Sequence, residues 1–370
     1  MTIWYAVGSA NMNSWGDTTS TIWNDAAGGA GNYMAGASFA AYNAAHLTDS
    51  FDSNGYTVTV NCNYTATLTR STGTKGGSGT GGFTVSTAVI ITSPITGGLV
   101  HTLTTTAAAG ITVTISGKIT GSITASKYGL NINGLGTLAL TGNVDAGSGS
   151  AANGIYMTLA GILTISGDIL GKVAVPAIYG LGTITITGSI TAGSTAGGYG
   201  INYAGTGTLT IINGPVTGGG AASAYAIFCN TAGATFILNN CNVLGNLGAG
   251  ICNSLNGTTN ITVNGNVTGG GASGANGIYM NGAGTLTVNG NVTVGSTALA
   301  YGIYNTTAIY SKVTINGSLI ATTVCGTPVA GPFTWVPSAT DCFKIPTTGG
   351  TIVNYYPGGC PILGEGNLVG

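Results

Sequence analysis

The stretch GTITITGSITAG at positions 182–193 returns along the chain in variants such as GILTISGDILG at 161–171 and GTLTVNGNVTVG at 284–295. Each variant has apolar residues two and four places before a glycine and again two places after it. These glycines stand at 117, 142, 167, 188, 214, 265, 290 and 317, mostly 25 or 26 residues apart. Asn240 lies near the place that is missing between 214 and 265. A repeat of this length indicates a repeat protein rather than several globular domains.

The apolar pattern within each unit predicts three short strands. Alternate residues such as Ile184 and Ile186 share one face of a strand, and the polar residues between them suit a solvated face. One coil cannot bury such a face alone, but stacked coils bury it against one another. We therefore expect an all-β fold, a single-stranded parallel β-helix (β-solenoid) of about nine to eleven coils with capped ends. The third strand should supply one interior column: Ile155, Ile178, Ile201, Ile227, Ile251, Ile278 and Ile303.

The two ends of the chain depart from the repeat. Residues 1–55 carry three of the four tryptophans and, at 33–47, a segment with the periodicity of a short helix. Residues 321–370 hold six of the nine prolines. Because the open ends of a solenoid need caps, we expect an N-terminal cap or attachment region at 1–55 and the β-helix at 56–320. Residues 321–370 would form a C-terminal cap that could also serve oligomerisation.

Charged residues are scarce. Lys, Arg, Asp and Glu make up 4 % of the chain, and the net charge is −1. Such a chain has almost no electrostatic field with which to attract DNA, RNA or an anionic membrane, so we expect no nucleic-acid partner. There is no run of eighteen apolar residues, so no membrane-spanning helix is expected either.

Residues suited to catalysis are equally scarce. Enzymes that cleave polysaccharides on a β-helix need clustered carboxylates, often with calcium, and a basic residue. In the clear coils only Asp145 and Asp168 are acidic, and we interpret both as turn-forming residues, with an acid–base pair as the alternative. The two histidines, His46 and His101, suffice for neither a zinc site nor a Ser/His/Asp arrangement. We therefore expect no catalytic residue, no cofactor and no metal site.

Seven cysteines are present and none forms a CxxC pair. The simplest interpretation is that they are small buried hydrophobic residues. The nonrepetitive tail allows one disulfide among Cys325, Cys342 and Cys360, with the pairing left open.

Strand alternation places the residue after each interior isoleucine on the outside of the coil. Many of these residues are aromatic: Tyr156, Tyr179, Phe228, Tyr279 and Tyr304. An exposed aromatic stripe is typical of a subunit interface or a glycan-binding surface, so we predict one of these roles. The alternative is that loops fold over the stripe.

A second outward surface is rich in threonine, with pairs such as Thr183 and Thr185 or Thr285 and Thr287. Regular threonine ladders on flat β-solenoids can order water, as in ice-binding proteins. Ala139 and Ile162 interrupt the ladder here, which argues against that function.

The repeated pattern G-x-L-T-I-x-G-x-V-T-G-G, followed by G-I-Y, resembles the right-handed parallel β-helix proteins of bacteriophage virions: tailspikes, fibres and capsid-decorating proteins. WYAVGSANMNSW at 4–15 and FDSNGYTVTV at 51–60 are similar to the opening of such proteins. The repeats cover about residues 51–320, and similar ones occur in bacterial surface adhesins. The resemblance implies a structural, non-enzymatic virion protein, with copies of itself in a homotrimer, other virion proteins and host surface glycans as partners. Catalytic residues of tailspikes have no counterpart here because the acidic clusters are absent.

The residues after Met1 show neither the basic start nor the long apolar run of a secretory signal. This favours a place in a virion, which is released by lysis. Two alternatives stay open: a secreted or cell-surface adhesin, and a carbohydrate-active β-helix enzyme.

Overall fold

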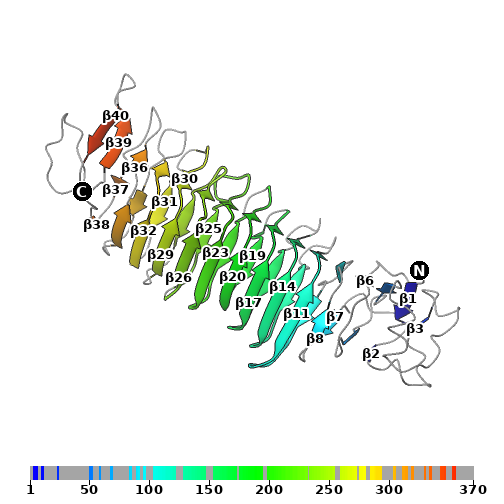
Figure 1. Cartoon of the computed structure of the whole chain (residues 1–370). Coiled ribbons are helices and arrows are strands. Elements are labelled where there is room, and N and C mark those ends of the chain that lie inside the picture. The colour runs from blue at the N-terminus through cyan, green and yellow to red at the C-terminus, as the bar shows by residue number, and fades with distance from the viewer. Residues whose placement is uncertain are drawn as a thin grey trace. The chain divides into compact units, whose positions relative to one another are not determined.

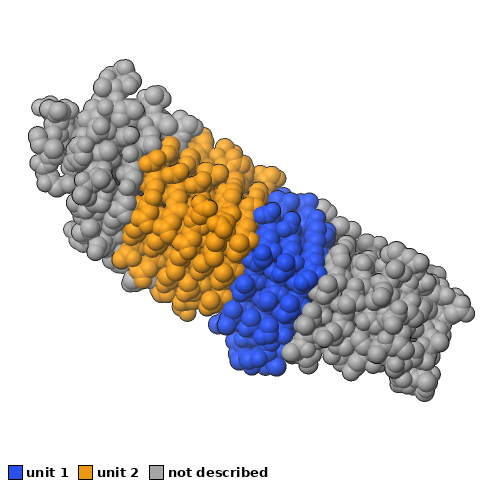
Figure 2. Space-filling view, viewed as in Figure 1, with its two compact units in different colours: residues 1–172 blue, residues 173–370 orange. Residues whose placement is uncertain are grey.

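A computed structural model describes nine segments with their side chains: residues 105–121, 128–146, 153–172, 175–194, 198–231, 233–254, 259–272, 275–279 and 285–293. Outside them only the backbone of further strands is described. The chain divides into two compact units, residues 1–172 (unit 1) and 173–370 (unit 2), coloured in Figure 2 and treated separately below. The described residues contain strands and no helix. The helix expected at 33–47 and the side chains of both expected caps lie outside them.

Each coil has three strands that lie on three faces, here called B, C and A in chain order. In one coil of unit 2 they are β22 (Ile201–Tyr203) on face B, β23 (Thr208–Ile212) on face C and β24 (Val216–Thr217) on face A. Every one of them pairs in parallel with the equivalent strand of the next coil, so that Ile201 lies beside Ile227. The prediction of a parallel β-helix is therefore confirmed.

In unit 1 the strands of each face follow one another in register (Figure 1). Face A holds β1 (Ile3–Ala6), β3 (Trp23–Asn24), β4 (Ser50–Asp52), β6 (Thr67–Thr69), β9 (Ile95–Thr96), β12 (Ile119–Thr120), β15 (Val144–Asp145) and β18 (Ile169–Leu170). Face B holds β2 (Ala10–Asn11), β5 (Val58–Thr59), β7 (Phe83–Val85), β10 (Leu103–Thr105), β13 (Leu130–Ile132) and β16 (Ile155–Met157). Face C holds β8 (Val89–Ile91), β11 (Thr112–Ser116), β14 (Thr137–Thr141) and β17 (Ile162–Ser166). The pairing of β1 with β3 is antiparallel.

Unit 2 repeats the arrangement (Figure 1). Besides β24, face A holds β21 (Ile190–Thr191), β27 (Val243–Leu244), β30 (Val267–Thr268), β33 (Val292–Thr293), β36 (Ser318–Ile320), β39 (Cys342–Pro346) and β40 (Ile352–Tyr355). Besides β22, face B holds β19 (Ile178–Gly180), β25 (Ile227–Cys229), β28 (Ile251–Asn253), β31 (Ile278–Met280), β34 (Ile303–Asn305) and β37 (Val329–Ala330). Besides β23, face C holds β20 (Thr183–Thr187), β26 (Thr235–Asn239), β29 (Thr259–Asn264), β32 (Gly284–Val288), β35 (Ser311–Ile315) and β38 (Phe333–Trp335). The pairing of β39 with β40 is antiparallel.

In six coils all three strands are described with their side chains. Two belong to unit 1 and begin at Leu130 and Ile155; four belong to unit 2 and begin at Ile178, Ile201, Ile227 and Ile251. The larger number of coils predicted from the sequence would require residues outside these coils, and that number stays a prediction.

The core is the set of apolar columns that the repeat predicted. Ile184, Ile186 and Ile190 of one coil are completely buried. The predicted third-strand column is buried as well at Ile155, Ile178, Ile201, Ile227, Ile251 and Ile278, with 0–1 % exposure; the side chain of Ile303 is outside the described residues. Burying each such side chain stabilises the fold by about 1.5–3 kcal/mol.

The turn between faces C and A has a residue other than glycine in one coil. The position missing between Gly214 and Gly265 is occupied by Cys241, directly after the Asn240 that the sequence placed near it: Gly265 would place a Cβ atom 2.1 Å from the carbonyl oxygen of Cys241. Asn240 instead adopts the left-handed φ of 50°, as Asn213 does with a φ of 58°. Asparagine tolerates that conformation better than most residues with a side chain.

Asparagine side chains connect successive turns of unit 2. The backbone N–H of Asn266 donates to Oδ1 of Asn242 at 2.9 Å, and the N–H of Asn291 donates to Oδ1 of Asn266 at 2.8 Å. On face C, Nδ2 of Asn264 donates to Oδ1 of Asn239 at 2.7 Å. Such ladders give the polar groups of each coil a partner in the next coil.

One interior residue breaks this pattern and gives a prediction. Asn253 is completely buried, and neither Oδ1 nor Nδ2 has a hydrogen-bond partner. Because a buried amide without partners pays its desolvation cost in full, we expect Asn253→Leu to raise the free energy of unfolding by roughly 1–2 kcal/mol. Urea unfolding measures the change. The matched variant Asn264→Leu breaks a ladder on the outside and should destabilise; a loss of stability in Asn253→Leu would contradict the prediction.

Candidate functional site

The predicted aromatic stripe lies in register on face B. In unit 2, Tyr179 pairs with Asn202, Asn202 with Phe228, Phe228 with Cys252, and Cys252 with Tyr279. The backbone of Tyr304 continues the column beside Tyr279, but its side chain is outside the described residues. Tyr156 lies on the same face in unit 1. The stripe therefore contains an asparagine and a cysteine between its aromatic members.

Two tyrosines from the loops of unit 2 join this column. The ring of Tyr199 stacks on Phe228 with centroids 4.9 Å apart, and the ring of Tyr225 lies 5.7 Å from the same ring. Tyr199 and Tyr225 are themselves nearly parallel, at 5.6 Å and 4°. All three residues are half-buried. We call Tyr199, Tyr225 and Phe228 the ring cluster.

Unit 1 has the same contact between loop and strand. The ring of Tyr128 stacks on Tyr156 at 4.1 Å and 25°. Tyr128, Tyr199 and Tyr225 each stand two residues before the first interior residue of a face B strand. Tyrosine followed by Gly or Ala and then Leu or Ile occurs at 128–130, 199–201, 225–227 and 301–303, but also at 179–181, where the tyrosine lies in β19.

The loop tyrosines cover part of the stripe. Cys252 was predicted to point outward and does, yet it is only 1 % exposed. The hydroxyl of Tyr225 donates a hydrogen bond to its sulfur. Burial raises the pKa of the Cys252 thiol and that of Tyr199, and raises the pKa of Tyr225 to about 12. The outer surface of face B is therefore only partly covered, because the ring cluster keeps part of its surface exposed.

The raised pKa values of buried tyrosine hydroxyls and cysteine thiols predict a loss of stability at alkaline pH. Burial raises the pKa of Tyr203 from 10.0 to about 12 and the pKa of Cys241 from 9.0 to about 12. Their folded-state pKa values lie above the unfolded ones, so this contribution is complete below about pH 9 and disappears as pH rises to about 12. Tyr203 alone accounts for roughly 2–3 kcal/mol.

Urea unfolding at pH 8 and pH 11 measures this effect. The variant Tyr203→Phe should have a shallower loss between the two values, because it has no phenol to ionise. Equal slopes in the two proteins would show that Tyr203 does not contribute to the alkaline transition.

Charged residues with described side chains gather in unit 1. The carboxylate of Asp145 lies 3.4 Å from Nζ of Lys172 and 3.9 Å from Nζ of Lys118. The prediction that Asp145 forms a turn is wrong, since it lies in β15, where alternation points its side chain outward. Asp168 does follow the turn glycine, and its backbone N–H donates to Oδ1 of Asn143 at 2.9 Å. Asp145 and Asp168 lie on neighbouring coils of unit 1. Asp145 is in a strand, and Asp168 is in a turn.

The remaining sequence predictions divide as follows. Cys229, Cys241 and Cys252 are free and buried, as predicted for small hydrophobic residues. The side chains of Cys325, Cys342 and Cys360 are outside the described residues, so their disulfide stays a prediction. Among the residues that the structure describes, no three His, Cys, Asp or Glu side chains gather as metal ligands, and no helix could span a membrane.

The threonines of face C form columns with gaps in both units. In unit 1, Ala139 and Ile162 interrupt them, as the sequence indicated. In unit 2, Thr185 and Thr210 are neighbours, but Ile237 follows before Thr262 and Thr287. These gaps leave no continuous threonine ladder in either described unit.

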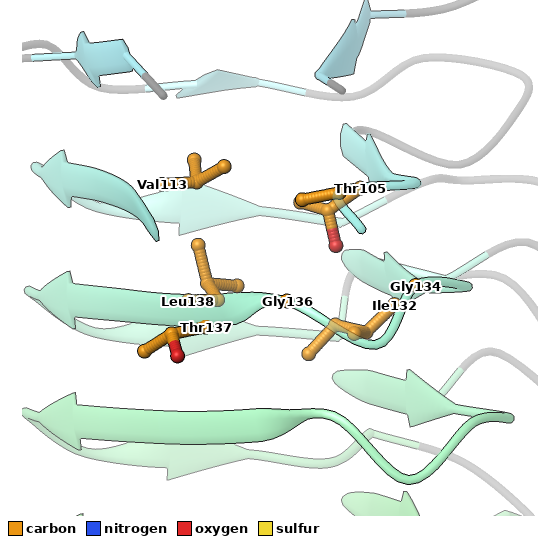
Figure 3. A pocket seen from close by; sticks show the side chains of 8 residues that line it. Thr105, Val113, Ile132, Gly134, Gly136, Thr137 and Leu138 are labelled. Atoms are coloured by element: carbon orange, nitrogen blue, oxygen red, sulfur yellow. The ribbon is translucent and has the colours of Figure 1, made fainter. Parts of the chain in front are cut away.

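A small hollow opens between two coils of unit 1 (Figure 3). Its walls are mainly Val113, Ile132 and Leu138, with Thr105 at one side. The space of about 190 Å³ includes solvent at its mouth and leaves no room for a water molecule. It is a packing gap rather than a ligand site.

Comparison with known proteins finds no matching family model, no matching curated protein and no matching solved structure.

Proposed function

We propose that this chain is a non-enzymatic structural protein of a bacteriophage virion, serving as a capsid decoration, fibre or spike, with adhesion to host surface glycans as an added role. The observation that carries the proposal is the repetition of one coil in strict register. In unit 2 each face repeats the same pairing from coil to coil, which suits a rigid spacer or support. The resemblance of the repeats to β-helix virion proteins supports the particular setting.

Mass spectrometry of purified phage particles from a culture that produces the chain tests the proposal. We expect the chain at a fixed number of copies per particle. A high copy number would indicate capsid decoration, and a low one a fibre or spike. Absence from particles, with recovery in the secreted or envelope fraction, would overturn the virion role and support a cell-surface adhesin. The ring cluster is the observation that favours this second candidate.

The oligomer that accompanies the virion role is a homotrimer, as the resemblance implies. Native mass spectrometry of the purified chain should then give three times the 36.1 kDa mass of one chain. A monomer at micromolar concentration would contradict it.

The carbohydrate-active enzyme is the third candidate, and it makes a separate prediction at Asp145. Lys118 and Lys172 are 55 % and 41 % exposed, so the ion pairs of Asp145 lie near solvent and each contributes little. We expect Asp145→Asn to lower the free energy of unfolding by less than about 1 kcal/mol and to leave glycan binding unchanged. Polysaccharide turnover by the natural chain that disappears in Asp145→Asn or Asp168→Asn, but not in Lys172→Gln, would establish the enzyme instead.

A further inference from the structure

We propose that the ring cluster of Tyr199, Tyr225 and Phe228, with Asn202 beside it, is a binding site for an uncharged glycan. The proposal rests on the adhesive part of the proposed function and names its site and ligand class. The proposed site lies in unit 2. It includes the loop residues Tyr199 and Tyr225, which do not belong to the outward column of face B.

The rings provide the apolar part of the site. Three aromatic residues from two coils lie within 5.7 Å of one another, and their planes differ by 4° to 28°. The parts of these stacked rings that stay exposed offer an apolar surface to the C–H groups of a sugar ring. Because each residue is half-buried, part of that surface stays open to a ligand while the rest is held by packing.

Asn202 provides the polar part. It pairs in register with Phe228, and its Oδ1 has no hydrogen-bond partner. An acceptor without a partner costs free energy that a ligand hydroxyl can recover. The Oδ1 atom itself is buried while the residue as a whole is half-buried, so a ligand hydroxyl reaches Oδ1 only after the terminal amide turns, about a torsion that has no steep preference. Ligand sites commonly combine such an apolar surface with a few polar groups.

The surroundings select against a charged ligand. Between Lys172 and Lys312 the sequence contains no Lys, Arg, His, Asp or Glu. No cation is therefore available from this stretch to pair with a uronate, sulfate or sialate, and removing such an anion from water without a partner is costly. Hydroxyl groups, by contrast, match the tyrosine and amide groups that are present. The ligand class is thus a neutral glycan.

Affinity electrophoresis of the full chain tests the proposal with neutral probes (glucan, mannan and galactan) and acidic ones (alginate and hyaluronan). We expect retardation by at least one neutral probe and by neither acidic probe. Phe228→Leu should weaken that binding roughly tenfold, because it removes the ring that both loop tyrosines contact. The matched control Tyr128→Leu removes the equivalent stacked ring in unit 1 and should leave binding unchanged.

A second variant keeps the test decisive if Phe228→Leu fails to fold. Asn202→Ala leaves the ring cluster in place and should still weaken binding severalfold, with an unchanged melting temperature as proof of folding. Preference for an acidic probe, no binding to any probe, or equal affinity of both variants and the natural chain would overturn the proposal. The composition of virions is measured separately. If the chain is found in virions but does not bind neutral glycans, only this inference is overturned. If the chain binds neutral glycans but is absent from virions, only the virion role is overturned.

Discussion

Gly205→Ala is expected to lower the free energy of unfolding by about 3 kcal/mol or more. Gly205 lies in the turn between β22 and β23, directly against the preceding coil. A Cβ atom at this position would stand 1.8 Å from the carbonyl oxygen of Leu181 and 2.3 Å from its carbonyl carbon. Both atoms belong to the backbone, so relief requires two coils to move apart, which weakens the hydrogen bonds between them.

Gly233→Ala is the control for this prediction. Gly233 precedes the face C strand of the next coil, and its Cβ atom would meet nothing closer than 3.9 Å, although its φ of +81° is unfavourable for alanine. The cost there should be only the backbone strain, about 1–2 kcal/mol. Thermal or urea unfolding of both variants measures the difference. Equal losses would mean that the close approach of the coils does not limit this turn.

Phe236→Ala is expected to cost 3–5 kcal/mol, roughly the range found for deletion of a buried aromatic ring. Phe236 is completely buried, and its ring meets that of Tyr203 edge-on at 5.3 Å and 72°. Strands from neighbouring coils hold the surrounding residues in register, so the site cannot collapse around the space left by the ring.

The neighbouring residue supplies the control. Ile237 follows Phe236 in the same strand, points to the opposite side and is only half-buried. Ile237→Ala should cost less than about 1 kcal/mol. Urea unfolding distinguishes the two, and comparable losses would show that the interior is not packed as the structure indicates.

The sequence predicted the core well because the core is periodic. Ile184, Ile186 and Ile190 stand at fixed distances from Gly188, and in a parallel stack the same distance means the same face in every coil. The positions of the candidate stripe followed from the same rule. Tyr179, Phe228 and Tyr279 occupy the predicted column of unit 2.

The period of the repeat could not predict how the loops place their side chains. Tyr199 and Tyr225 belong to loops of different composition, so alternation gave no direction for their rings, and the burial of Cys252 beneath Tyr225 could not be foreseen. The turn at Asn240 and Cys241 lacks the glycine, so the glycine spacing located it only approximately. At this turn, as at Asn213 before Gly214, an asparagine has the positive φ.

The asparagine ladder of unit 2 has a consequence for how such a chain changes over generations. Asn266 accepts an N–H from Asn291 and donates its own N–H to Asn242. Its coil therefore offers an acceptor to one neighbouring coil and a donor to the other. A coil copied or lost by unequal recombination would therefore meet matching groups at both of its new junctions. Length in this protein can then vary in whole coils while the lateral surfaces of the remaining coils stay as they were.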